Sequence, residues 1–272
     1  MNNLTLHTSH LTFHISHPYP MLSISYDSTF DGFLSVVFEI YRQHLEVGEI
    51  HGDRSTSPCN LFMQPFRIET SEEEAARLKR AIENYTSADI LELLHVAFRS
   101  EEEGIEMKIL AYLRKVFDGK DPKYAKNPTS DEMLPLFMTA RAVRHEAGGM
   151  LGLVRFSKTV DGTYFAEIEP KYDILEMMIG HFRGRFANEK WAIYDSKRGF
   201  GVYYDGHSPT EITIPNLKQV SASVSTPDEF VRLWQDYYKS IAIKERENPK
   251  LLRRCLPVRY WNHLPERQMA SC

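Results

Sequence analysis

Apolar positions in the first half of the chain repeat mostly with the period of a helix. Residues 22–26 alternate as a short strand would, and residues 30–44 carry an apolar stripe at intervals of three and four positions. The polar stretch 48–60 predicts a loop, and the strand-like residues 61–69 follow it. Residues 71–146 predict three or four helices, with a start signal at 70–73 and stops at 84–85, at 100–104 and in the loop 118–130.

The pattern changes near residue 148. Residues 148–170 and 191–206 each contain two strand-like runs around a turn, which predicts two hairpins. Between them, residues 173–186 carry an apolar stripe that predicts a helix lying on the sheet. A last helix is expected from Thr226 to Ile241, because Pro227 stands at its first position and Glu229 at its third.

These patterns predict an α+β protein. We expect a helical first half and a C-terminal helix around a small antiparallel sheet, built from two hairpins that flank one helix. A single domain is expected over residues 21–267. Its parts are a mainly helical part over 21–148, a hairpin–helix–hairpin part over 149–222, and a C-terminal helix with a basic tail over 223–267.

Residues 1–20 contain no Lys, Arg, Asp or Glu, which sets them apart from the rest of the chain. They lack the positive n-region and continuous apolar core of a secretory signal, so a disordered or mis-annotated leader is expected. His7, His10, His14 and His17 would share one face of a helix and could bind zinc or nickel. Because the stretch alternates like strand or coil and has no accompanying Asp, Glu or Cys, no metal site is expected.

The composition is that of a soluble globular protein. Of 272 residues, 42% are apolar and 26% are charged. No apolar run approaches the ~20 residues of a membrane-spanning helix, so no membrane is expected as a partner. Cys59, Cys255 and Cys272 lie far apart, which predicts neither a thiolate zinc site nor a disulfide framework and favours a reducing cytoplasm.

The net charge of −4 is unevenly distributed. Residues 69–106 contain eleven acidic and four basic residues, whereas residues 239–259 contain seven basic and two acidic ones. The two segments could attract each other in the fold, or could mark one face that repels nucleic acid and one that attracts it. The alternative for each run is a solvated helix face.

A cationic rim around the sheet is the first candidate nucleic-acid contact. His181 and Arg185 are four positions apart and would share a helix face, where both could meet a phosphate. The alternative is a set of ordinary surface arginines bridged to Glu167, Glu169 and Asp173. The candidate arginines are Arg141, Arg144, Arg155, Arg183, Arg185 and Arg198.

The tail, residues 248–266, is the second candidate. Lys250, Arg253, Arg254 and Arg259 are expected to face a nucleic acid or a partner protein. Two aromatic residues, Tyr260 and Trp261, either stack on a base or anchor the tail. The residues expected to pack inward are Leu251, Leu252, Leu256 and Trp261.

An acid–base site would use His145 or His181 as the proton carrier, with Glu146 or Asp195 to orient it. Nothing in the spacing requires this arrangement. The sequence has no G-x-S-x-G elbow, H-E-x-x-H helix, P-loop, dinucleotide fingerprint or zinc-deaminase motif. We therefore favour a protein without catalytic activity of its own and expect no cofactor.

Several stretches fall in the same order as in a bacterial domain-of-unknown-function family. They are YDSTFDGFLSVVFEIY near the start, RHEAGGMLGLVRF, DGTYFAEIEPKYDILEMMIGHFRGRF and WAIYDSKRGFGVYYDG in the middle, and ITIPNL and IKERENPKLLRRCLPVRYWNHLPE at the end. From Met21 to Glu266 the chain resembles this family, whose members are described as DNA metabolism proteins.

The resemblance implies a partnership with a radical SAM protein of DNA modification or repair, and in some relatives a fusion to a uracil-DNA glycosylase-like domain. This chain lacks the C-x-x-x-C-x-x-C cluster that would hold an iron–sulfur centre, so radical chemistry would belong to the partner. No catalytic residue carries over from the family. Residues 144–146 depart from the more basic stretch expected there.

Three hypotheses follow. The favoured one is a non-catalytic accessory protein in DNA metabolism or repair that binds nucleic acid, the radical SAM partner, or both. The second is an enzyme that acts on DNA or a modified base through His145 or His181. The third is a protein-interaction subunit without DNA affinity.

Overall fold

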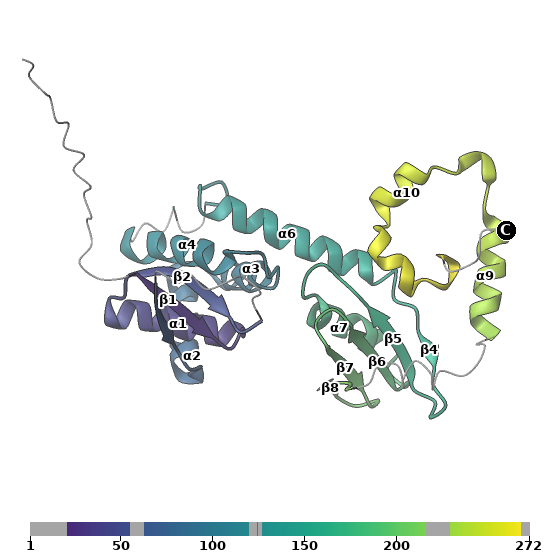
Figure 1. The fold of residues 1–272 in the computed structure, drawn as a ribbon, viewed down its shortest axis with the longest axis horizontal. Helices are drawn as coiled ribbons and strands as arrows, with labels where there is room; N and C mark the ends of the chain where they lie inside the picture. Colours follow the sequence, from purple (N-terminus) through teal and green to yellow (C-terminus); the bar gives the residue numbers. More distant parts are fainter. Residues whose placement is uncertain (1–20, 55–62, 120–123, 125–126, 216–228, 268–272) are drawn as a thin grey trace, which may run out of the picture. The chain divides into compact units, whose positions relative to one another are not determined.

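The computed structural model describes residues 21–54, 63–119, 124, 127–215 and 229–267 (Figure 1). The chain divides into two compact units, the first from residues 1–88 and 106–125 and the second from residues 89–105 and 126–272. The predicted leader and its four histidines lie outside the described residues. The single domain expected over 21–267 stays a prediction.

The first unit contains a three-stranded parallel sheet in the order β2-β1-β3. β1 (Leu22–Tyr26) confirms the strand predicted at residues 22–26, and β3 (Gln64–Arg67) lies within the strand-like stretch 61–69. β2 (Val47–Gly52) corrects the loop predicted from residue 48, because it pairs with β1 and buries Val47 and Ile50. Only two apolar residues mark this strand, so pattern reading misses it.

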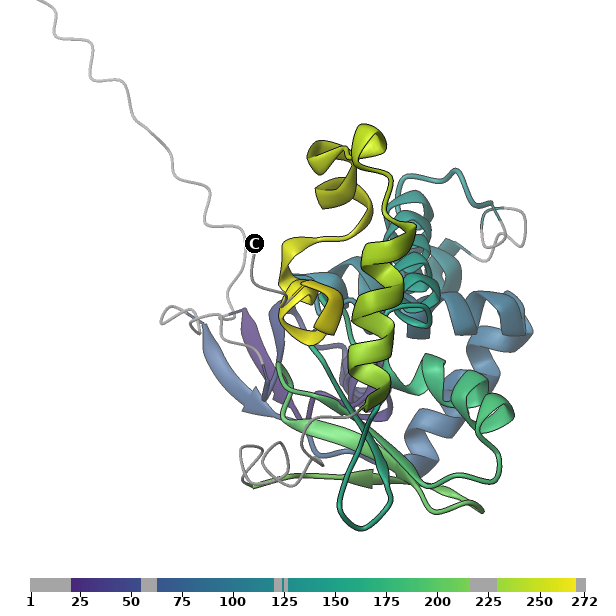
Figure 2. The same ribbon diagram turned by 90° about the vertical axis from the view of Figure 1, so that its right-hand side faces the viewer.

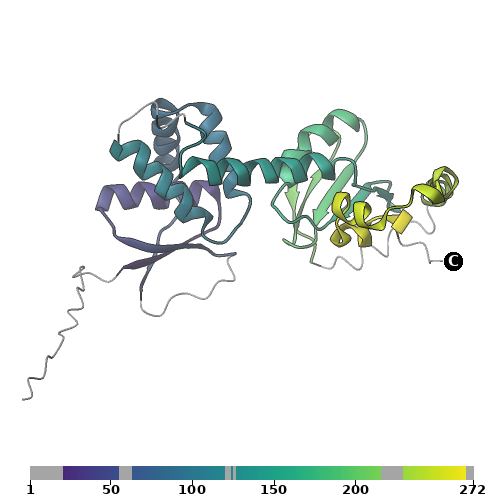
Figure 3. The ribbon, with the colours of Figure 1, turned by 90° about the horizontal axis from the view of Figure 1, so that it is seen from above.

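Helices α1 (Phe30–Gln43), α2 (Glu72–Tyr85) and α4 (Ile105–Gly119) lie on one face of this sheet (Figure 3). The Thr29 hydroxyl caps α1 by accepting a hydrogen bond from the Gly32 N–H at 2.9 Å. These bounds confirm the helix predicted over residues 30–44 and the start signal at 70–73.

The second unit includes α3 (Ala88–Phe98), apart from its first residue, and α6 (Met133–Met150). With α2 and α4, they account for the helices predicted over residues 71–146. The stops predicted at 84–85 and 100–104 are confirmed, because α2 ends at Tyr85 and residues 99–104 separate α3 from α4, whereas the predicted loop 118–130 lies largely outside the described residues. α6 continues through Gly148 and Gly149 and buries Met150, so the first hairpin starts later than predicted.

The sheet of the second unit has the strand order β4-β5-β6-β7-β8. Its two hairpins flank one helix, which confirms the α+β prediction. The sheet is mixed rather than antiparallel, because the helix α7 carries the chain back and β5 then runs parallel to β6. The elements are β4 (Ser157–Lys158), β5 (Tyr164–Ile168), α7 (Leu175–Arg185), β6 (Trp191–Asp195), β7 (Phe200–Tyr204) and β8 (Pro209–Ile212).

Alternation along the strands gives this sheet two faces with buried side chains. On one face, the Phe182 ring of α7 packs against Trp191, with 6.1 Å between the ring centres. On the other face, Phe165, Ala192 and Tyr194 form a buried cluster. The prediction that the helix after the first hairpin lies on the sheet is therefore confirmed.

The described end of the chain, residues 229–267, contains two α-helices and three short 3₁₀ helices and folds back on itself. Figures 1 and 2 show it leaving α9, turning through α10 and returning beside α9 through η2 and η3. α9 confirms the last predicted helix over its described residues, and Thr226 to Asp228 lie outside them. The elements are α9 (Glu229–Ile241), η1 (Lys244–Arg246), α10 (Pro249–Cys255), η2 (Val258–His263) and η3 (Pro265–Arg267).

The described residues contain neither a cluster of metal-ligating side chains nor a membrane-spanning helix. Nowhere in this part of the chain do three His, Cys, Asp or Glu side chains gather as a metal ion would require. No helix within it is both long and apolar enough to cross a bilayer.

Candidate functional site

The Glu146 carboxylate, on α6, fixes the tail to α6 and to the segment around Lys171 within the second unit. Its Oε1 atom accepts the backbone N–H of Lys171 at 2.9 Å, and its Oε2 atom accepts that of Tyr172 at 2.8 Å. The Arg259 guanidinium donates to Oε1 at 2.8 Å, and the Tyr260 hydroxyl donates to the same oxygen. Arg259 and Tyr260 therefore anchor the tail. Tyr260 is 6% exposed, which favours the predicted anchoring over stacking, and the nucleic-acid contact of Arg259, whose side chain is 42% exposed, stays a prediction.

The surroundings of Glu146 favour its ionised form. Burial alone would raise the pKa of this carboxyl, because desolvation penalises the charge. Hydrogen bonds from Tyr260, from the two backbone amides and from Arg259 outweigh burial and hold the pKa below its usual range. The side chain is only 8% exposed, so little water competes for these bonds.

Glu146→Gln should lower the free energy of unfolding by about 2–3 kcal/mol at neutral pH, because hydrogen bonds to a charged group contribute about 1.5–3 kcal/mol. The folded-state pKa is depressed, so this stabilisation is complete above the unfolded-state pKa, about 4.3, and is lost as the pH falls through the folded-state value. Urea unfolding of both proteins should show their difference shrinking in acid. Glu189→Gln, at an exposed position, is the control, and a difference independent of pH would contradict this role.

A second carboxylate, that of Glu266 in η3, holds α9. Its Oε1 accepts a hydrogen bond from Arg155 at 2.8 Å, and its Oε2 accepts one from the Trp234 indole N–H at 2.9 Å. The Arg155 guanidinium also lies over the Trp234 ring, 5.1 Å from its centre. Arg155 thus holds α9 and η3 together, and its assignment as a nucleic-acid contact stays a prediction.

Arg198 lies inside the second unit and not on its rim. Its side chain is 4% exposed, and that of Asp195 is fully buried. The guanidinium donates to Asp195 Oδ2 at 2.8 Å, to Glu101 Oε2 at 2.6 Å and to the Lys171 carbonyl at 3.0 Å. Because these donors are used within the unit, the expectation that Arg198 meets a phosphate is corrected.

The predicted acid–base pairs do not form among the described residues. His145 and His181 are both exposed, and neither hydrogen-bonds a carboxylate there. Burial raises the pKa of Asp195, although hydrogen bonds from Arg198 oppose this rise. Asp195 orients Arg198 and not a histidine, and the Glu146 oxygens accept hydrogen bonds from the tail and from the Lys171 and Tyr172 amides.

The other predicted cations are exposed and lie on three helices. Figures 1 and 2 show α7 and α10 apart, in agreement with the treatment of the rim and the tail as two separate candidates. On α6, Arg144 is paired with Glu92 at 3.0 Å. These cations are Arg141 and Arg144 on α6, Arg183 and Arg185 on α7, and Lys250, Arg253 and Arg254 on α10.

The α10 group is the densest. Lys250, Arg253 and Arg254 are three and four positions apart within one short helix, so they lie on one face. All three are exposed, and within the described residues none of them forms an ion pair. The Asn248 side chain caps this helix by accepting the Leu251 N–H at 3.0 Å. α10 therefore presents three cations on a helix with a defined start.

The apolar residues of the tail are less buried than predicted. Leu252, Leu256 and Trp261 are half-buried, and the Trp261 indole N–H donates to the Leu256 carbonyl at 3.1 Å. The Arg267 guanidinium lies over the Trp261 ring, 4.3 Å from its centre. Leu251 is 46% exposed, which corrects the expectation that it packs inward. Trp261 therefore makes its contacts within the end of the chain, with Leu256 and Arg267.

The sequence analysis did not identify the carboxylates that form ion pairs with Arg155 and Arg198. The pair Arg198–Glu101 joins residues 97 positions apart, and Arg155–Glu266 joins residues 111 positions apart. No local spacing signals such pairs. The terminal Leu264-Pro265-Glu266 stretch was the available signal for Glu266.

The fold and the site define an α+β chain whose basic tail is fixed by two buried carboxylates. A family model described as a domain of unknown function, DUF4130, matches residues 103–266. The match spans more than half of the chain, and the chain belongs to this family. Glu146, Asp195, Arg198 and Glu266 all lie within the matched residues. No curated protein and no solved structure matches the chain.

Proposed function

We propose that this chain is a non-catalytic accessory protein of DNA metabolism or repair, acting in the cytoplasm, and that it binds nucleic acid through α10. The observation that carries the proposal is the exposed cationic face formed by Lys250, Arg253 and Arg254. Cations that no neighbouring carboxylate neutralises can displace condensed counterions from a phosphate backbone, which favours association.

The anchoring of the tail supports this role. After α10, Arg259 is hydrogen-bonded to Glu146 of α6. Before α10, α9 is held by the hydrogen bond from Trp234 to Glu266 of η3. Because both flanks of α10 are held in place, less conformational freedom is lost when its cations meet a strand than in an unanchored tail.

The proposal also includes a protein partner, which the resemblance to DNA metabolism proteins supports. This partner is the radical SAM protein of DNA modification or repair, and it supplies the chemistry. This chain holds or positions the nucleic acid for it. The exposed arginines of α7, Arg183 and Arg185, are a second group that could contact the same strand.

Cys255, an exposed free thiol at the end of α10, reports on this surface. Saturating duplex DNA at low salt should slow its alkylation by N-ethylmaleimide several-fold, because a strand on Arg253 and Arg254 covers the thiol. High salt should restore the rate, since the contacts are electrostatic. Peptide-resolved mass spectrometry separates Cys255 from Cys59 and Cys272. An unchanged rate with DNA at low salt would refute binding at α10.

α9 favours a second candidate, the protein-interaction subunit without DNA affinity. Leu233, Tyr237 and Ile241 recur at intervals of four positions and are 54–58% exposed. They form an apolar stripe at the surface of the described structure, and such a stripe is typical of a helix that docks on another protein. Binding of the radical SAM partner by a chain that shows no DNA affinity would favour this candidate.

A further inference from the structure

An exposed stripe runs along α6, away from the residues that this helix buries. Large apolar side chains form its first part, in which Leu134 is 45% exposed, Phe137 38% and Met138 51%. Single exposed apolar side chains are common on protein surfaces, whereas three within five positions of one helix form a patch. The stripe, called the α6 stripe below, consists of Leu134, Phe137, Met138, Arg141, His145 and Gly148, all of them exposed.

The spacing along the α6 stripe fits a second helix as its occupant. From Leu134 through Met138, Arg141 and His145 to Gly148, the intervals alternate between four and three positions. A stripe with this repeat stays in line beneath a helix that crosses it at a small angle. Its length of about 21 Å corresponds to some four helical turns. A Cβ on Gly148 would meet no atom within 4 Å, so a partner backbone has room to come close there.

The residue types of the α6 stripe are those of a protein interface. Phenylalanine, methionine and arginine are enriched at interfaces relative to the rest of a protein surface. Phe137, Met138 and Arg141 lie within five positions of one another. An amphipathic helix commonly binds to such an apolar surface through residues at intervals of three and four positions.

Arg141 determines the charge that the occupant must carry. It is exposed and forms no ion pair with a described residue, whereas Arg144 is paired with Glu92 at 3.0 Å. A helix that covers Leu134 and Met138 also covers Arg141 and removes water from its guanidinium. Because burial of a charge without a partner is unfavourable, the occupant has to supply a carboxylate at this position.

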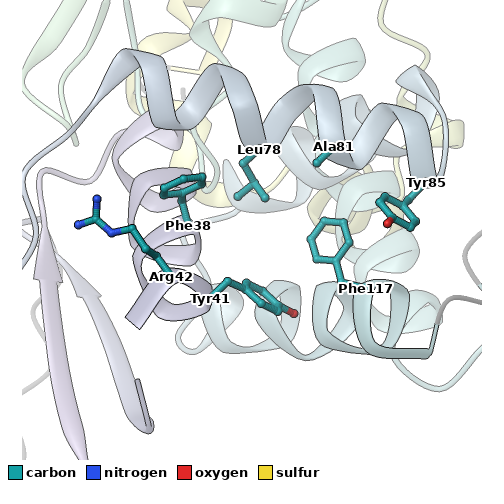
Figure 4. Close-up of a pocket in the computed structure, with 7 residues that line it drawn as sticks. All are labelled: Phe38, Tyr41, Arg42, Leu78, Ala81, Tyr85 and Phe117. Atoms are coloured by element: carbon teal, nitrogen blue, oxygen red, sulfur yellow. The ribbon is translucent and has the colours of Figure 1, made fainter. Parts of the chain in front are cut away.

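A pocket in the first unit shows the difference that an unpaired charge makes. Aromatic and aliphatic side chains line this pocket between α1, α2 and α4 (Figure 4). Its charged residue, Arg42, is paired with Glu39 and, at 3.3 Å, with Glu74. The pocket therefore does not specify the charge of a ligand, whereas the α6 stripe does.

A second copy of the chain does not supply the carboxylate. When two copies associate through the same helix about a twofold axis, the residues at the middle of the shared surface face each other. Arg141 lies seven positions from each end of the α6 stripe, so two guanidinium groups would meet there. Like charges in contact are unfavourable, which leaves another protein as the occupant.

We propose that the α6 stripe docks an acidic amphipathic helix of a partner protein. Apolar residues of that helix pack on Leu134, Phe137 and Met138, and one of its carboxylates pairs with Arg141. This surface shares no residue with the cations of α10 or with the apolar stripe of α9, so the proposal is independent of nucleic-acid binding.

Two synthetic helical peptides of about 18 residues, long enough to cover the stripe, test the proposal. Both carry leucine at intervals of three and four positions. The other positions hold alanine and glutamate in one peptide, and alanine and lysine in the other. In fluorescence-anisotropy titrations, the wild-type protein should bind the glutamate peptide about tenfold more tightly than the lysine peptide. The net charge of the chain is −4, so non-specific attraction would give the opposite order.

Phe137→Ser/Met138→Ser should weaken binding of the glutamate peptide by about tenfold or more, because it removes the apolar contacts. Arg141→Glu should reverse the preference, so that the lysine peptide binds more tightly. Val160→Ser is the control, because Val160 is 81% exposed in a turn outside the stripe, and it should leave both affinities unchanged. All four side chains are exposed, so circular dichroism should show wild-type folding in every variant.

Absence of glutamate-peptide binding to the folded wild-type protein would overturn the docking surface, and equal affinity for the two peptides would overturn the role of Arg141. Loss of binding in Arg253→Glu/Arg254→Glu, with Phe137→Ser/Met138→Ser unaffected, would place the peptide on α10 instead. Analytical ultracentrifugation tests the remaining occupant. A wild-type dimer that becomes a monomer in Phe137→Ser/Met138→Ser would show that a second copy covers the stripe, which would also overturn the proposal.

Discussion

Arg198→Met is expected to lower the free energy of unfolding of the second unit by about 3–5 kcal/mol, because it leaves a buried charge without its partner. Asp195 is fully buried, and Arg198 is the cation beside it. Glu101 loses its hydrogen bonds from Arg198 as well. The backbone of Glu101 has a φ of 50°, in the left-handed region that non-glycine residues rarely adopt, and these hydrogen bonds help to hold it there. Urea unfolding followed by circular dichroism measures the effect.

Arg183→Met is the matched control, because Arg183 is exposed and forms no ion pair with a described residue. Its effect should stay within about 0.5 kcal/mol. The double variant Asp195→Leu/Arg198→Met should recover part of the loss, since neither charge is then left alone. A loss below about 1 kcal/mol in Arg198→Met would show that the buried pair does not stabilise the unit.

The double variant Arg253→Glu/Arg254→Glu is expected to bind DNA about 10- to 100-fold more weakly than the wild-type protein at about 0.1 M salt. Each phosphate contact contributes roughly eightfold at that salt concentration through counterion release, and reversed charge adds repulsion. Neither residue contacts Glu146 or Glu266, so the anchors of the tail stay intact. Fluorescence anisotropy with labelled DNA measures the affinities.

Lys108→Glu/Lys115→Glu is the matched control for charge. Both lysines are exposed on α4, in the first unit, and the double variant changes the net charge by the same amount. Its DNA affinity should change less than about threefold. Equal losses in the two double variants would show that net charge, and not α10, determines binding.

Those parts of the fold that depend on local signals could be predicted from the sequence. α1 and α2 begin at side-chain caps, and the hairpins are recognised by turns between stretches in which apolar and polar residues alternate. β2 carries too few apolar residues to be recognised, and its pairing with β1 comes from the fold. The parallel pairing of β5 with β6 follows from the path of the chain through α7, which periodicity does not encode.

The same distinction holds for the candidate site. The α10 cations are singled out by the density of basic residues in this part of the sequence, and the structure shows three of them exposed on one short helix. Arg155, Arg198 and Arg259 look identical to them in sequence, yet each is occupied by a carboxylate about 100 positions away. Whether an arginine is available to a ligand depends on such distant partners, so composition and spacing alone cannot separate contact residues from anchors.

Titration of labelled single- and double-stranded DNA with the wild-type protein, at two salt concentrations, tests most directly whether this chain binds nucleic acid. We expect binding whose log K falls against log salt with a slope of about −2 to −3 for duplex, which corresponds to two or three phosphates contacted by the α10 cations. Absence of binding by the folded wild-type protein at low salt would contradict the nucleic-acid role and would leave partner docking through α9 as the function to test.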